Sequence, residues 1–254
     1  MLVDRIEAFV RDEASGDFSE LVLEAFSFQL ERIEPYRAMC ERLGRTPESV
    51  SDWREIPLVP TRAFQTMELS AGDTGEVFRS SGTTGSGRST HHHPFPDLYR
   101  TTIDTAFPAH CLPPPGRDVP MLSLIPDREQ LPDSSLSFMV DHVVRSWGSA
   151  ASAWAVGPSG VDGRALRSWL GARQREGRPV LVLATAFALV EALESLERLG
   201  LRFRLPPGSL LFETGGYKGR SRELTPDELE QRLAEALGLP PESIVREYGM
   251  TELT

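Results

Sequence analysis

The segment best suited to chemistry is a short run of glycine and hydroxyl residues at positions 80–90. It contains three glycines and seven serines or threonines, and it directly follows a predicted strand over 76–79. Glycine lets the backbone turn several N–H groups toward one point, and short hydroxyl side chains can donate to the same point. This combination suits the oxygens of a phosphate group. It is also typical of a flexible surface loop, so composition alone leaves both interpretations open.

One candidate for this run is the P-loop of nucleotide hydrolases. Gly82 and Gly87 have the P-loop spacing, but Arg88 stands where that motif has a lysine. Arginine is a planar fork rather than a compact ammonium and would not contact the same phosphates unchanged. A P-loop also runs straight into a helix, whereas residues 91–96 include two prolines. These departures disfavour the P-loop interpretation.

Two further motifs follow in the second half of the chain. Residues 213–218 read E-T-G-G-Y-K and residues 247–252 read E-Y-G-M-T-E. Together with S-S-G-T-T-G at 80–85, they resemble, in the same order, the motifs of the adenylate-forming synthetases, the superfamily of acyl-CoA ligases and luciferases. Longer strings at 125–127, 132–139 and 212–220 resemble the acyl-protein synthetases of the bioluminescence type (LuxE-like). The resemblance runs from about residue 64 to residue 254.

The resemblance implies an ATP-dependent ligase. Such an enzyme activates a carboxylic acid as an acyl-adenylate and passes the acyl group to a protein thiol. The resemblance to LuxE-like proteins implies that the acid is a long-chain fatty acid. It would use ATP and Mg²⁺, and its partner would be an acyl-accepting protein such as a reductase subunit. Two alternatives stay open: an acyl-CoA or carrier-protein ligase for another carboxylic acid, and a truncated nucleotide-binding module without turnover.

The resemblance also implies roles for individual residues. The β- and γ-phosphates would be held by the loop residues Ser80, Ser81, Gly82, Thr83, Thr84 and Gly85, with Arg88 as a charge partner. Thr251 would donate to the α-phosphate and Glu252 would hold Mg²⁺, a hard cation that prefers oxygen; with Thr84 they form the catalytic set. The adenine would be contacted by Gly215, Gly216, Tyr217, Tyr248, Gly249 and Met250.

Three other kinds of residue could carry chemistry. His142 lies in a predicted apolar helix, where it is expected either to contact the acyl substrate or to fill a groove in the core. Three adjacent histidines at 91–93 point in alternating directions in an extended segment and cannot all reach one metal ion. Cys40 and Cys111 are too few for a disulfide framework or a zinc site, and each is either an acyl acceptor or a buried thiol.

The elements that position these residues alternate along the chain. The first 45 residues have helical periodicity, and Pro35 and Gly44 are expected to end that stretch. Strands are predicted over 76–79, 121–125, 153–156, 180–183, 209–212 and 244–246. Helices are predicted over 97–107, 134–147, 161–176, 185–199 and 225–237. This order favours an α/β fold with layered mixed, largely parallel sheets and flanking helices, preceded by a helical amino-terminal segment.

Composition limits the classes of function. The chain has 254 residues, a hydrophobic fraction of 40% and a formal charge of −10, so it can build a core and is a poor partner for a nucleic-acid backbone. Its longest apolar run, 180–190, is too short to cross a bilayer, and charged residues interrupt its first 11 residues. We expect a cytoplasmic location without a transmembrane segment.

The resemblance divides the chain into a helical segment over 1–50 and an incomplete adenylation domain over 51–254. Relatives continue beyond the Y-G-x-T-E motif with an acid that holds the ribose and a mobile carboxy-terminal lid domain. That lid supplies a lysine for adenylation, and the later chain carries the acyl-accepting cysteine. The lid is absent from this sequence, so we expect either a truncated sequence or a separate polypeptide that supplies the rest.

Overall fold

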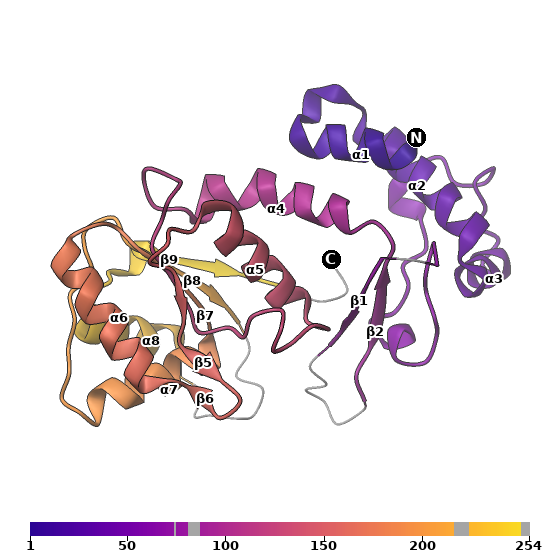
Figure 1. Cartoon of the computed structure of the whole chain (residues 1–254). Coiled ribbons are helices and arrows are strands. Elements are labelled where there is room, and N and C mark those ends of the chain that lie inside the picture. The colour runs from indigo at the N-terminus through magenta and orange to yellow at the C-terminus, as the bar shows by residue number, and fades with distance from the viewer. Residues whose placement is uncertain (74, 81–86, 216–223, 250–254) are drawn as a thin grey trace. The chain divides into compact units, whose positions relative to one another are not determined.

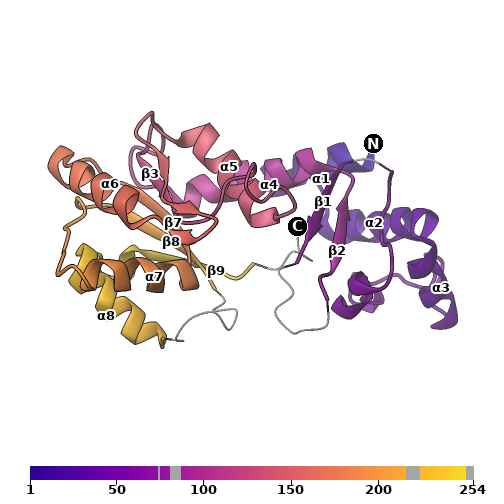
Figure 2. The ribbon, with the colours of Figure 1, turned by 60° about the horizontal axis from the view of Figure 1, so that its bottom comes forward.

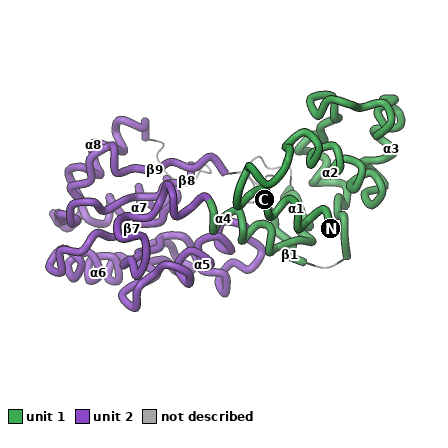
Figure 3. Tube along the Cα trace, turned by 90° about the horizontal axis from the view of Figure 1, so that it is seen from above, with its two compact units in different colours: residues 1–105, 250–254 green, residues 106–249 purple. Residues whose placement is uncertain are grey.

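The chain divides into two compact units. The computed structural model describes residues 1–73, 75–80, 87–215 and 224–249. The first unit runs from Met1 to Thr105 and the second from Ala106 to Gly249 (Figure 3). The expected division between residues 50 and 51 stays a prediction.

Helices dominate the amino-terminal part of the first unit, as predicted. Three helices are present: α1 (Leu2–Arg11), α2 (Phe18–Arg32) and α3 (Glu34–Arg42). Asp17 caps α2 by accepting a hydrogen bond from the backbone N–H of Glu20. Pro35 does not end the helical stretch as expected: it lies in the first turn of α3, where a missing N–H is tolerated. Buried side chains from these helices and the following loop form a small core: Phe26, Leu30, Tyr36, Cys40 and Val50.

The rest of the first unit contains short 3-10 helices and a two-stranded antiparallel sheet. The 3-10 helices are η1 (Glu13–Ser15), η2 (Trp53–Glu55) and η3 (Thr61–Gln65). Strand β1 (Glu76–Arg79) was predicted, whereas its partner β2 (Thr90–His93) was not. Glu76 lies opposite His93 and Arg79 opposite Thr90. Strand β2 could not be predicted because three consecutive histidines lack the alternation of apolar and polar residues.

A five-stranded sheet forms the centre of the second unit, and every pairing in it is parallel, as expected. The strands lie in the order β4-β3-β7-β8-β9. Their bounds are β3 (Met121–Ser123), β4 (Ala153–Trp154), β7 (Leu181–Thr185), β8 (Leu210–Thr214) and β9 (Ile244–Glu247). The predicted strand at 153–156 divides into β4 and β5 (Val156–Gly157), and β5 pairs with β6 (Gly160–Val161) as a short antiparallel ribbon.

Helices cover both faces of this sheet, which gives it the doubly wound arrangement seen in Figures 1 and 2. They are α4 (Pro96–Cys111), α5 (Ser135–Trp147), α6 (Gly163–Glu176), α7 (Ala186–Glu197) and α8 (Pro226–Leu237), with the 3-10 turn η4 (Pro241–Ser243) before β9. Helix α4 passes through Pro108 and ends four residues beyond its predicted end. Thr225 and Glu228 form a capping box at the start of α8, which begins one residue after its predicted start. No helix in the described ranges is long and apolar enough to cross a membrane.

The two faces of the sheet pack against different helices. Leu211 belongs to the main apolar core together with residues of α6, α7 and α8. The next residue along β8, Phe212, points to the opposite face, where its ring lies 5.4 Å from that of Phe107 in α4. Strand β7 is buried on both sides, as parallel strands require.

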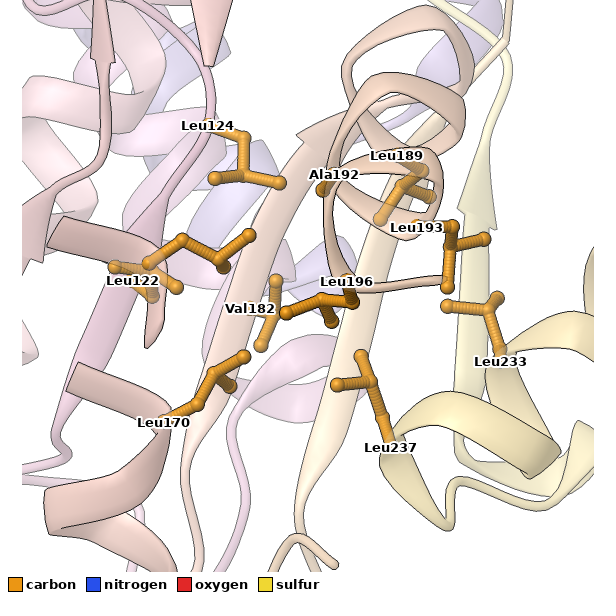
Figure 4. Close-up of a pocket in the computed structure, with 11 residues that line it drawn as sticks. Leu122, Leu124, Leu170, Val182, Leu189, Ala192, Leu193, Leu196, Leu233 and Leu237 are labelled. Atoms are coloured by element: carbon orange, nitrogen blue, oxygen red, sulfur yellow. The ribbon is translucent and has the colours of Figure 1, made fainter. Parts of the chain in front are cut away.

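A small apolar cavity lies within the main core, between the sheet and helices α6, α7 and α8 (Figure 4). All the space between atoms at this place, including space open to solvent, amounts to about 310 Å³. The cavity is lined by Leu122, Leu124, Leu166, Leu170, Val182, Leu189, Ala192, Leu193, Leu196, Leu233 and Leu237. Every lining residue is at least nine-tenths buried and none is polar. We therefore interpret this space as imperfect packing of the core rather than as a ligand site.

Enlarging this cavity is expected to destabilise the second unit. Replacing Leu193 with Ala removes a side chain that is 1% exposed and should lower the free energy of unfolding by about 2–5 kcal/mol. Leu199 is the matched control because it is 53% exposed, and its replacement by Ala should have a much smaller effect. Urea unfolding followed by circular dichroism measures both. Equal effects of the two substitutions would contradict the packing described here.

Candidate functional site

In the first unit, two serines close the stem of the glycine-rich loop. Ser80 follows β1 and Ser89 precedes β2, and the N–H of Ser80 donates to the carbonyl oxygen of Ser89 at 3.0 Å. In return, the N–H of Ser89 donates to Oγ of Ser80 at 2.9 Å. The loop residues Ser81, Gly82, Thr83, Thr84 and Gly85 lie outside the described residues. The stem joins two antiparallel strands rather than a strand and a helix, which excludes the P-loop interpretation.

The side chain of Arg88 also contributes to this stem. Its Nε donates to the carbonyl oxygen of Ser80 at 2.7 Å, and its Nη2 donates to that of Arg79 at 3.3 Å. The guanidinium therefore satisfies carbonyl groups at the end of β1. Its predicted contact with phosphate stays a prediction.

The three histidines after the loop contact three different neighbours. Nε2 of buried His91 lies 2.8 Å from Oγ of Ser89, so His91 supports the loop stem. Nε2 of His92 lies 4.0 Å from Oε1 of Glu68, and the ring of His93 stacks on Tyr99. In the part of the chain that the structure describes, no group of three metal-ligating side chains is present.

In the second unit, the predicted adenine residues follow two neighbouring strands. Gly215 directly follows β8, and Tyr248 and Gly249 directly follow β9. Thr214 and Glu247, the last residues of these strands, are partners in the parallel register, so Gly215 and Tyr248 leave the sheet at the same edge. Gly216, Tyr217, Met250, Thr251 and Glu252 lie outside the described residues.

Gly215 and Tyr248 are both exposed. A Cβ placed on Gly215 would meet no atom within 4 Å, so this glycine is not needed to avoid a clash within the described chain. Tyr248 is 83% exposed. An exposed aromatic ring is a surface on which a flat heterocycle such as adenine can stack.

An ion-pair cluster that the sequence analysis missed lies just before these two residues. Nε of Arg246 in β9 lies 3.3 Å from Oε2 of Glu213 in β8, and its Nη2 donates to Oε1 of Glu230 in α8 at 2.8 Å. Burial raises the pKa of Glu213, and the charge and hydrogen bond of Arg246 oppose this rise. No local pattern in the sequence indicated this cluster, because its members lie 16 to 33 positions apart in three different elements.

On the opposite face of the sheet, aromatic side chains of α4 and α5 pack together. Phe107 stacks on Trp147 with ring centroids 6.3 Å apart, and His142 meets Trp147 edge-on at 6.2 Å. His142 is half-buried in this group. This environment is compatible both with contact to an apolar substrate and with a side chain that fills a groove in the core. Its predicted contact with substrate stays a prediction.

The two cysteines lack the environment of an acyl acceptor. Both Cys40 and Cys111 are buried. Burial raises the pKa of the Cys40 thiol, and burial together with the nearby charge of Glu247 raises the pKa of Cys111 to about 11. Because the thiolate is the nucleophile, both groups are poorly suited to attack an acyl-adenylate.

Comparisons with known proteins agree with this architecture. No protein-family model matches the sequence. Over 70 residues, 26% of this chain, the sequence is 41% identical to a long-chain-fatty-acid–luciferin-component ligase of Vibrio harveyi. In three dimensions, 95% of the chain aligns with an open conformation of 2-hydroxyisobutyryl-CoA ligase in complex with 2-HIB-AMP and CoA, at a TM-score of 0.62 and 13% identity. The chain has an adenylate-forming ligase fold.

The matched regions are only part of each relative. They cover 18% of the Vibrio harveyi ligase and 51% of the CoA ligase. The resemblance to LuxE-like acyl-protein synthetases is thus confirmed over a limited stretch, and the adenylate-forming ligase fold is confirmed over nearly the whole chain.

Glu247, a half-buried acid at the end of β9, gives a pH-dependent prediction. Burial raises the pKa of Glu247, so ionisation of this group destabilises the folded state above the pKa of an unfolded glutamate, about 4.3. Glu247→Gln should therefore increase the free energy of unfolding at pH 7–8, and the gain should vanish below about pH 4 because both states are then protonated.

Chemical unfolding at several pH values measures this difference. Glu242→Gln, at an exposed position of η4, is the control for loss of one negative charge. A gain from Glu247→Gln that persists unchanged at pH 4, or that Glu242→Gln reproduces, would contradict the assigned cause.

Proposed function

We propose that this chain is the ATP-binding part of a ligase that activates a carboxylic acid as an acyl-adenylate. The observation that carries the proposal is the position of Gly215 and Tyr248 at the same edge of two neighbouring parallel strands, within an adenylate-forming ligase fold. Open crevices at the carboxyl ends of parallel strands are the usual ligand sites of such sheets. The order of the three motifs along the sequence supports the same assignment.

The proposed reaction forms one bond and breaks one. A carboxylate oxygen of the substrate attacks the α-phosphorus of ATP, the new P–O bond forms, and the bond to the β-phosphate oxygen breaks to release pyrophosphate. The protein contributes alignment and stabilisation of charge on the phosphoryl oxygens. Thr251 would donate to the α-phosphate, and the loop from Ser80 to Gly85, including Thr84, would hold the β- and γ-phosphates.

The adenine would lie between the exposed ring of Tyr248 and the open backbone at Gly215. Gly216, Tyr217, Gly249 and Met250 would complete its surroundings. Glu252 would hold Mg²⁺, which when bound offsets negative charge on the phosphate oxygens.

The proposed substrate is a long-chain fatty acid and the proposed acceptor is a protein thiol. The relative from Vibrio harveyi supports the fatty-acid substrate, because its name specifies a long-chain fatty acid that is joined to a luciferin component. Cys40 and Cys111 are the two cysteines of this sequence and both are buried, which supports an acceptor thiol outside this sequence. Transfer to CoA is the second candidate, favoured by the fold shared with 2-hydroxyisobutyryl-CoA ligase.

Exchange of labelled pyrophosphate into ATP tests the proposed activation step. The assay uses the longest natural polypeptide that contains this sequence, with fatty, short hydroxy, aromatic and amino acids in turn. We expect exchange with long-chain fatty acids. Exchange with another class of acid would support the second candidate, and nucleotide binding without exchange for any acid would leave only a binding module.

Two substitutions test the proposed catalytic residues. Glu252→Gln and Thr251→Val should each reduce the rate of exchange by about 100-fold, because each removes a group that stabilises charge in the transition state. Glu242→Gln, at the exposed position in η4, should leave the rate unchanged. Unchanged exchange in Glu252→Gln would remove the assignment of Glu252 to the metal.

A further inference from the structure

Arg246 connects three elements at the edge of the sheet where Gly215 and Tyr248 lie. From β9, its guanidinium contacts Glu213 of β8 and Glu230 of α8 through two different nitrogens. Arginine can do this because its donors form a rigid planar fork, whereas the single ammonium of lysine is a point charge. The three side chains therefore tie the last two strands to each other and to the helix that connects them.

The ion pair between Arg246 and Glu213 involves a buried carboxylate. Glu213 is 5% exposed, while Glu230 and Arg246 are partly accessible to water. A buried carboxylate that loses its counter-ion must take up a proton or move toward solvent. Arg246 supplies this counter-ion and so favours the ionised form of Glu213 near the end of β8.

The cluster is also close along the chain to the proposed nucleotide residues. Glu213 precedes Gly215 by two residues, and Arg246 precedes Tyr248 by two residues. Glu213 and Arg246 are direct partners in the register of β8 and β9. A shift of either strand end would therefore change the separation between Gly215 and Tyr248.

We propose that Arg246 is a positioning residue of the nucleotide site: by bridging Glu213 and Glu230, it holds Gly215 and Tyr248 at the separation that binds adenine. This inference rests on the proposed function.

The test measures nucleotide binding and stability separately, in the longest natural polypeptide that contains this sequence. Binding of a fluorescent N-methylanthraniloyl ATP is titrated without any carboxylic acid, and the melting temperature is recorded for each variant. Arg246→Met should weaken ATP binding by about 10–100-fold, as expected for a displaced contact surface. Arg246→Lys should fall between this variant and the wild type, because lysine keeps the charge but not the fork.

Arg232→Met is the matched control. Arg232 lies on α8 and forms a two-pronged ion pair with Glu197 of α7, at 2.8 and 2.7 Å, without touching β8 or β9. It should lower the melting temperature but leave the ATP dissociation constant unchanged.

The double variant Glu213→Gln with Arg246→Met separates positioning from stability. It contains no unpaired buried carboxylate, so its melting temperature should recover relative to Arg246→Met, while its ATP binding should stay weak because the bridge to Glu230 is missing. Recovery of ATP binding along with stability would overturn the positioning role.

The failure of this inference can be told apart from failure of the proposed function. If the wild-type protein binds ATP and Arg246→Met binds it equally well, the positioning role is wrong and the proposed function stands. If the wild-type protein does not bind ATP, both are wrong.

Discussion

The second unit depends on the pairing of parallel strands, which have to be covered on both faces. A parallel connection must cross back over the sheet, and the helices that do so bury each face. Strand β7 shows the result, since Leu181, Val182, Leu183 and Ala184 are all buried. Because neighbouring strands are parallel, their carboxyl ends lie at the same edge of the sheet. Gly215 and Tyr248, 33 positions apart in sequence, therefore leave the sheet side by side.

Charge inside this apolar unit is concentrated near that edge. Glu213 is buried and paired with Arg246, and Glu247 is half-buried on the opposite face near Cys111. Buried acids reduce stability unless they are paired, and they are therefore expected where a fold serves a purpose other than packing. The cavity between the sheet and helices α6, α7 and α8 is the contrasting case, because only leucine, valine and alanine side chains line it.

In the first unit, the glycine-rich loop connects two antiparallel strands rather than following a strand of a parallel sheet. Reciprocal hydrogen bonds between Ser80 and Ser89 close the stem, and Arg88 and His91 add contacts to it. A hairpin stem closed in this manner fixes Ser80 and Ser89 as the two points between which the loop runs. This arrangement differs from a P-loop, in which a helix amino-terminus holds the phosphate.

The class of fold and the family resemblance could be predicted from the sequence. Alternating apolar runs and caps such as Thr225 with Glu228 depend on neighbours in the chain, so they can be read locally. Motifs such as S-S-G-T-T-G reveal chemistry by residue type and order in the same way. The assignments of Ser81 to Gly85, Thr251 and Glu252 still rest on these motifs.

Only the tertiary structure decided which distant residues meet. The strand at Thr90–His93 exists because it pairs with β1, and Pro35 begins a helix because its neighbours pack into a core. The cluster of Glu213, Glu230 and Arg246 is invisible in the sequence because its members are 16 to 33 positions apart. Strand register brings them together, and register is a property of the whole sheet rather than of any local segment.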